Sequence, residues 1–170
     1  MKGLFRATAV AALTLLAMLV PTAAASATTV DFTTHGQGWF DQSFYVRDGV
    51  TFTQGDFVGW IQGDEALVGP IAGDFKPKVS SLSARVAPAV QGTAIYTLSA
   101  LSPSGRVIES TSVTITQDTG DPDTGPFGYV TIDLGTLPRK AASFSLTNTF
   151  VRSSYPQYTT MPFGVSSISF

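Results

Sequence analysis

The sequence predicts an all-β protein built as one antiparallel β-sandwich, and three observations support that fold class. Hydrophobic and polar side chains alternate along most of the chain after residue 28, as they do in strands with one buried face. Turn-forming dipeptides divide this part of the chain into roughly eight to ten short segments. No stretch longer than about ten residues after residue 28 shows the i, i+3, i+4, i+7 spacing of a helix. A barrel is the alternative, but long irregular connections, expected for example at residues 61–79, suit the Greek-key crossings of a sandwich.

The first 27 residues are predicted to be a secretory signal peptide, which leaves residues 28–170 as a single domain. Lys2 and Arg6 precede an uncharged apolar run at 9–20, and Ala25-Ser26-Ala27 supplies a small-residue cleavage pattern. The apolar run is too short to span a bilayer comfortably. We therefore expect a secreted, extracellular protein with no membrane span in the mature chain.

The composition of residues 28–170 excludes several classes of function. The chain has no cysteine, which excludes disulfides and thiolate metal sites. Without Lys2 and Arg6, the 10 Lys and Arg residues become 8 against 12 Asp and Glu, a net charge of −4. Scattered cations on a mildly acidic chain make nucleic acid an improbable partner. Abundant Thr and Ser, with sparse charge, suit an extracellular β-protein with hydroxyl-rich strand faces.

The expected strands follow one another along the chain. They are an opening strand at 30–32, consecutive strands within 44–61, and strands at 81–86, 93–101, 106–116, 128–135, 143–150 and 164–170. Ser102-Pro103-Ser104-Gly105 has the residues of a type I turn. Asp48-Gly49 and Gly55-Asp56 predict two further reversals. Residues 137–140 (LPRK) are expected to close a strand.

The stretch FYVRDGVTFTQGDFVGW, residues 44–60, is rich in aromatic residues but is explained as strands joined by turns. Its apolar side chains are expected to enter the core, and no principal site is placed there. The expected core residues are Phe44, Val50, Phe52 and Phe57, with Ile61 just after them.

The mature chain resembles secreted jelly-roll domains of the galactose-binding-like and carbohydrate-binding-module kind. The residues that carry the resemblance are Val30-Asp31-Phe32, Tyr45 followed by GVTF, and the segments SLSARV, TLSALSPSGRVIES and GVSSISF. The resemblance implies a jelly-roll β-sandwich in which the TLSAL/RVIES pair forms a hairpin. It also implies that the closing strand lies beside the opening one, so that the two ends of the domain meet.

Catalytic motifs are absent from the sequence, and we do not expect an enzyme. His35 is the sole histidine, and a solvated loop position is expected for it. No G-x-S-x-G or H-E-x-x-H motif occurs. Glu65 and Glu109 are the only glutamates and are interpreted as surface charges, although two carboxyls facing each other across a cleft would indicate a glycosidase.

No cofactor is expected apart from a candidate structural calcium ion. The segment Asp118-Thr119-Gly120-Asp121-Pro122-Asp123 brings three carboxylates together, but its spacing is not that of an EF-hand, and a solvated acidic turn is favoured. The resemblance implies a calcium site between the first and last strands. Asp31 matches its acid, whereas Ser166 and Ser167 stand where a second acid would be needed.

Loop aromatics are the candidate ligand-binding residues. Sugar-binding modules lay flat rings against pyranose faces and add polar groups at the rim. Tyr155, Gln157 and Tyr158, with Arg152 nearby, form the best candidate, and a loop that merely covers the sandwich end is the alternative. Trp39 and Trp60 are further candidates, although a core or half-buried position is favoured for both.

The sequence therefore predicts a secreted, non-catalytic domain that binds carbohydrate or another cell-surface ligand through loop aromatics. The alternative is a structural or protein-interaction domain of the cell surface with no small ligand.

Overall fold

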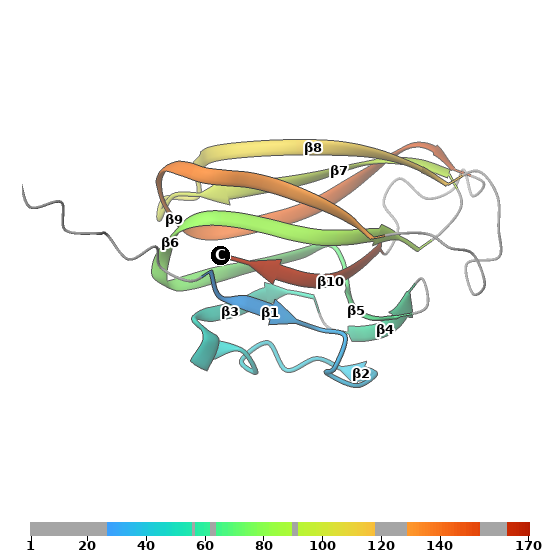
Figure 1. The fold of residues 1–170 in the computed structure, drawn as a ribbon, viewed down its shortest axis with the longest axis horizontal. Helices are drawn as coiled ribbons and strands as arrows, with labels where there is room; N and C mark the ends of the chain where they lie inside the picture. Colours follow the sequence, from blue (N-terminus) through green and yellow to red (C-terminus); the bar gives the residue numbers. More distant parts are fainter. Residues whose placement is uncertain (1–26, 56, 62–63, 90–91, 118–128, 154–162) are drawn as a thin grey trace, which may run out of the picture.

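A computed structural model describes residues 27–55, 57–61, 64–89, 92–117, 129–153 and 163–170, without the side chains of Trp60, Asp64, Arg152 and Ser153 (Figure 1). The described chain is almost entirely strand. Its elements are β1 (Thr29–Asp31), β2 (Gly38–Trp39), the 3-10 helix η1 (Val46–Asp48), β3 (Val50–Gln54), β4 (Phe57–Ile61), β5 (Asp64–Val68), β6 (Ile71–Pro88), β7 (Gly92–Leu101), β8 (Val107–Gln117), β9 (Val130–Ser153) and β10 (Phe163–Ser169). Among these elements no helix has the length and hydropathy needed to cross a membrane.

Every strand pair is antiparallel, and the hydrogen-bonded order is β2-β4-β5-β10-β6-β9-β7-β8, with β1 on β10 and β3 on β6. The long strands β6 and β9 turn back at one end of the molecule (Figure 1) and belong to two layers. The start of β6 pairs with β3 and the second half of β9. The end of β6 pairs with β10 and the first half of β9. The chain thereby folds one continuous hydrogen-bonded sheet into a sandwich.

Aromatic side chains join the two layers. Tyr96 of β7 meets Phe163 of β10 with ring centroids 5.3 Å apart. Phe32, just after β1, meets Phe52 of β3 at 5.6 Å. All four side chains are buried. Burial of such large apolar surfaces between layers is the main stabilising contribution in a protein without disulfides. The predicted all-β antiparallel sandwich is confirmed.

The two ends of the domain meet as expected. Thr29 pairs with Ser169 and Val30 with Ile168 in the β1–β10 register. The predicted β7–β8 hairpin is also present. Its turn is closed by the Gly105 amide, which donates to the Ser102 carbonyl at 2.9 Å, and Gly105 takes a φ of 75° that glycine tolerates best.

Two sequence predictions about strand boundaries are wrong. Residues 61–79 were expected to be an irregular connection, but β5 and the start of β6 occupy most of them. Gly73 hides the strand pattern because it fills a buried position with no side chain of its own. The ring of Phe144 covers it, only 2.7 Å from where a Cβ would lie.

The second wrong boundary is the one at residues 137–140, which do not close a strand. Instead, β9 continues through them at a corner. Between the pairs Ser81–Thr136 and Val79–Ala141, β6 advances by two residues while β9 advances by five. The extra residues bulge out, and a bulge tolerates Pro138, which has no amide proton to donate to a partner strand.

The outer face of the β7–β8–β9 layer is rich in hydroxyls. Thr97 and Ser112 lie 2.8 Å apart across the β7–β8 pair, and Ser99 and Ser110 lie 2.9 Å apart. Cross-strand pairs of this kind contribute roughly 0.2–1 kcal/mol each. The composition-based expectation of hydroxyl-rich strand faces is confirmed.

Alkaline solution is expected to destabilise the sandwich through Tyr96. Burial raises the pKa of Tyr96 to about 12, although a hydrogen bond with the Asn148 side chain opposes that shift. A tyrosine in the unfolded chain titrates near pH 10, so between pH 10 and 12 the unfolded state loses its proton first. The free energy of unfolding should therefore fall by about 1.4 kcal/mol between pH 8 and pH 11 on account of this group.

Urea unfolding at pH 8 and pH 11 measures this loss. Tyr96→Phe removes the titrating group and should flatten the pH dependence by the same amount, whatever its effect on stability at pH 8. An equal alkaline loss in both proteins would contradict the assignment to Tyr96.

Candidate functional site

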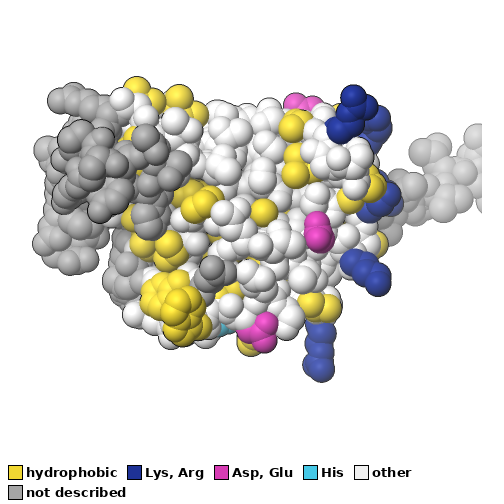
Figure 2. Space-filling view, turned by 180° about the vertical axis from the view of Figure 1, so that it is seen from behind, with side chains coloured by type: hydrophobic (Ala, Val, Ile, Leu, Met, Phe, Trp, Pro, Cys, Tyr) yellow, Lys and Arg dark blue, Asp and Glu magenta, His cyan; other side chains and the backbone are white. Residues whose placement is uncertain are grey.

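Trp39 forms an exposed aromatic surface with Phe57. In the β2–β4 pair Trp39 lies opposite Phe57, and their ring centroids are 6.1 Å apart in an edge-to-face arrangement. Trp39 is 84% exposed and Phe57 43% exposed. Figure 2 shows exposed hydrophobic side chains gathered at the end of the molecule where β2 and β4 lie. We call this pair the Trp39 surface.

Two sequence predictions are corrected here, since Trp39 was expected in a core or half-buried position and Phe57 was expected to enter the core. The reason is strand alternation. Val58 is fully buried and takes the inward position of β4, so its neighbour Phe57 faces outward. Trp39, as the register partner of Phe57, lies on the same outward face.

An aromatic cluster supports the segment that carries Trp39. The His35 ring lies 4.8 Å from Phe44 and 5.2 Å from Phe40. Phe40 and Tyr45 continue the cluster into the core, with Phe32 between them. His35 was expected to be solvated, but its ring is half-buried against these neighbours.

Phe44 was expected in the core and is instead 59% exposed, because it covers the outer side of His35. His35 Nδ1 lies 3.1 Å from the Gly36 carbonyl. Its Nε2 is buried, with no hydrogen-bond partner in the described part of the chain. The His35 ring therefore acts as an aromatic packing residue that supports the segment carrying Trp39.

Hydrogen bonds hold the same segment to the sandwich. The Glu65 carboxylate accepts a hydrogen bond from the Gly36 amide at 2.8 Å. Asp31 accepts hydrogen bonds from the amide and hydroxyl of Thr33, and Asp41 accepts the same pair from Ser43. The bonds from the Ser43 amide and hydroxyl lower the pKa of Asp41. These contacts pre-organise Trp39, which lowers the entropy that a ligand must overcome on binding.

The described acids that the sequence suggested for catalysis or calcium binding have structural roles or lie apart from one another. Glu65 binds the Gly36 amide, and Glu109 lies on β8 in the other layer. Asp31 pairs with Ser167 across β1 and β10, while its carboxylate serves the Thr33 turn. Among the described residues no group of three or more His, Cys, Asp or Glu could hold a metal ion. The predicted acidic segment 118–125 lies outside the described residues.

The remaining candidate residues are placed only by their backbone or not at all. Trp60 lies in β4 opposite Glu65, and Arg152 lies in β9 opposite Thr93. Tyr155, Gln157 and Tyr158 lie outside the described residues. The flanks of that segment, the end of β9 and the start of β10, reach the end of the sandwich that also holds β4 and β5 (Figure 1).

The fold and this site define a small antiparallel β-sandwich with an exposed aromatic pair formed across a short edge strand, β2, and its neighbour β4. No family model, no curated protein and no solved structure matches this chain.

Proposed function

We propose that this protein is a secreted, non-catalytic carbohydrate-binding domain. The observation that carries the proposal is the 84% exposure of Trp39 on a segment held by hydrogen bonds and aromatic packing. A large ring kept in water costs free energy unless a ligand covers it, and flat rings bind the apolar faces of sugars. Phe57 contacts the indole in an edge-to-face arrangement, and the high exposure of Trp39 leaves at least one face of the indole open to a pyranose.

Of the other residues predicted from the sequence to bind a ligand, Trp60 lies in β4 and Arg152 near the end of β9, and both strands reach the same end of the sandwich (Figure 1). We propose that these two residues, with Tyr155, Gln157 and Tyr158, form the rim of the site. Their hydroxyl, amide and guanidinium groups supply the hydrogen bonds that would select among sugars.

Trp39→Ala is expected to weaken binding of neutral polysaccharides by roughly tenfold to a hundredfold, the usual cost of losing an aromatic anchor. Affinity electrophoresis of residues 28–170 through gels that contain neutral soluble polysaccharides measures the change. Trp39→Phe keeps a ring and should retain part of the affinity. Val46→Ala removes an exposed apolar side chain from η1, away from Trp39, and should change nothing.

The Tyr155→Ala, Tyr158→Ala double variant tests the proposed rim in the same gels. A loss similar to that of Trp39→Ala supports one extended site. Unchanged mobility of the native domain in every gel, confirmed on insoluble glycans by pull-down, would contradict the proposed function.

The edge strand β8 favours a second candidate function, that of a protein-interaction domain. Within the described chain β8 pairs only with β7, so its outer edge presents backbone groups along 11 residues. An extended segment of another protein can add to such an edge. A domain that retains no glycan but forms a specific complex blocked by a proline substitution in β8 would support this candidate instead.

A further inference from the structure

Positive charge is concentrated at the end of the sandwich opposite the Trp39 surface. Six of the 8 Lys and Arg residues outside the predicted signal peptide lie there, at η1, at the corners of β6 and β9, and after the β7–β8 turn. All six are exposed, and Figure 2 shows the dark blue side chains gathered at this end. We call it the basic end; its cations are Arg47, Lys76, Lys78, Arg106, Arg139 and Lys140.

These cations are not neutralised by ion pairs. None of the six forms an ion pair with another residue in the described part of the chain. The carboxylates nearest in sequence are Asp48, beside Arg47, Asp74 and Glu109. They are fewer than the cations, so a positive potential extends from this end into solvent.

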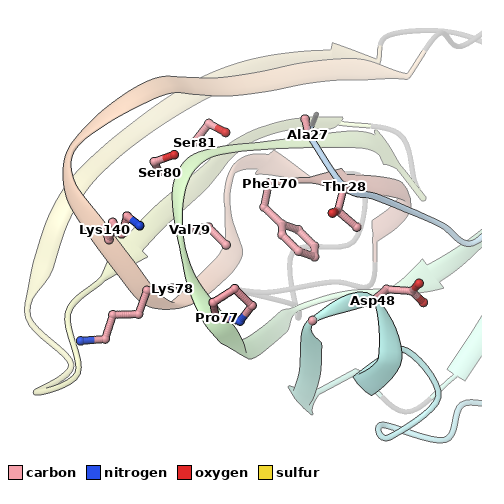
Figure 3. Close-up of a pocket in the computed structure, with 11 residues that line it drawn as sticks. Ala27, Thr28, Asp48, Pro77, Lys78, Val79, Ser80, Ser81, Lys140 and Phe170 are labelled. Atoms are coloured by element: carbon pink, nitrogen blue, oxygen red, sulfur yellow. The ribbon is translucent and has the colours of Figure 1, made fainter. Parts of the chain in front are cut away.

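A first hollow, of about 290 Å³, lies between the corner of β6 and the end of β10. Figure 3 shows Lys78 and Lys140 on one side, Ser80 and Ser81 beside them, and the ring of Phe170, just after β10, facing the hollow. The Phe170 ring is held in place by Phe75, with centroids 4.8 Å apart. The hollow thus combines two cations, two hydroxyls and an aromatic wall, and the Asp48 carboxylate lies on the side away from the two lysines (Figure 3).

A second hollow, of about 360 Å³, lies beside the β7–β8 turn. Ser102, Ser104, Arg106 and Arg139 line it. Arg139 and Lys140 are consecutive residues at the corner of β9, and each lines a different hollow. A chain-like ligand that crosses this corner can therefore place one unit in each hollow. Each volume lies near the lower end of the range for small-molecule sites.

We propose that the basic end binds an acidic polysaccharide, a chain of sugar units that carry carboxylate or sulfate groups. Lysine and arginine pair with the acid groups, serine hydroxyls bond the sugar hydroxyls, and the Phe170 ring covers an apolar sugar face. Single-stranded nucleic acid requires exposed rings for base stacking. Of the described residues that line the two hollows, Phe170 alone is aromatic, and a single half-buried ring offers no series of rings for successive bases.

Binding to polygalacturonate and to dextran sulfate, with unsulfated dextran as the neutral reference, tests this proposal on residues 28–170. The native domain should bind both polyanions and not the neutral chain, and the affinity should fall steeply between about 50 and 500 mM salt. Arg139→Gln and Lys140→Gln should each weaken binding by about threefold to fivefold, and the double variant by about tenfold or more.

Arg85→Gln is the matched control, because it removes one exposed cation near the end of β6, outside both hollows, where Arg85 lies over the Tyr129 ring. It should leave polyanion binding within about twofold of the native value. Trp39→Ala should also leave it unchanged, so this site can stand even if the neutral-sugar site fails. Thermal midpoints show that each variant is folded.

Three outcomes would overturn the proposal. The first is the absence of binding to either polyanion at low salt. The second is an equal loss of polyanion affinity in Arg85→Gln and Lys140→Gln, which would mean that binding depends only on the net charge of the protein. The third is tighter binding to a DNA duplex or to phosphatidylglycerol vesicles than to both glycans, which would assign the basic end to another class of partner.

Discussion

Replacing Phe144 by alanine is expected to lower the free energy of unfolding by about 3–5 kcal/mol. Phe144 lies in the second half of β9 and is 1% exposed. Its ring stacks on Phe75 of β6 at 5.3 Å and meets Phe52 of β3 edge-to-face at 6.0 Å. It also covers Gly73, which has no side chain to fill the space that alanine would leave. The neighbouring strand therefore cannot fill the cavity. The loss in free energy of unfolding should lie in the upper part of the usual range for this substitution.

Urea unfolding of the native and variant proteins at pH 7 measures this loss. Phe144→Leu keeps most of the volume and should cost clearly less, while Val151→Ala, at an exposed position farther along β9, should cost under about 0.5 kcal/mol. A loss below about 1 kcal/mol for Phe144→Ala would contradict the packing of this layer.

The same aromatic contacts connect the core to the basic end. Phe75 stacks on Phe144 and also meets Phe170, whose ring forms the wall of the first hollow. The hollow is thus built on the core and not on a surface loop. Its shape depends on the corner of β6, which carries Lys76 and Lys78 directly after Phe75.

Strands with clear alternation were predicted correctly from the sequence. In β7, Ala94, Tyr96, Leu98 and Ala100 are buried, as their period of two indicates. The start of β6 was missed because Gly73 relies on Phe144 of another strand for its packing. Local sequence carries no signal of a ring supplied from about 70 residues away.

The candidate site could be predicted only in part, for a similar reason. Trp39 was recognised as a candidate, but its exposure follows from pairing with Phe57, whose outward direction is set by buried Val58. The basic end was not predicted at all. Its cations are scattered between positions 47 and 140, and only the corners of β6 and β9 bring them to one end. Sequence spacing records neither register nor corners.

Gly69→Ala is expected to lower the free energy of unfolding by about 3 kcal/mol, the upper part of the range for overpacking a core. Gly69 lies between β5 and β6, and its amide donates a hydrogen bond to the Phe163 carbonyl at 2.8 Å. A Cβ at this position would lie 2.4 Å from Phe163 Cζ and under 3 Å from two further ring atoms. The ring cannot move aside, because it is fully buried and meets Tyr96 of the other layer at 5.3 Å.

A double-mutant cycle with Phe163→Leu separates this clash from a general effect of the alanine. Leucine is smaller than the ring and leaves room for the new methyl group, so Gly69→Ala should cost much less in the Phe163→Leu background than in the native one. The coupling free energy, taken from urea unfolding of all four proteins, should reach about 1–2 kcal/mol. Additive costs would mean that Phe163 does not lie over Gly69. The contact between the layer that contains β10 and the layer that contains β7 would then be wrong as well. The position of the Trp39 surface depends on this contact, because β5 and β4 connect β10 to β2.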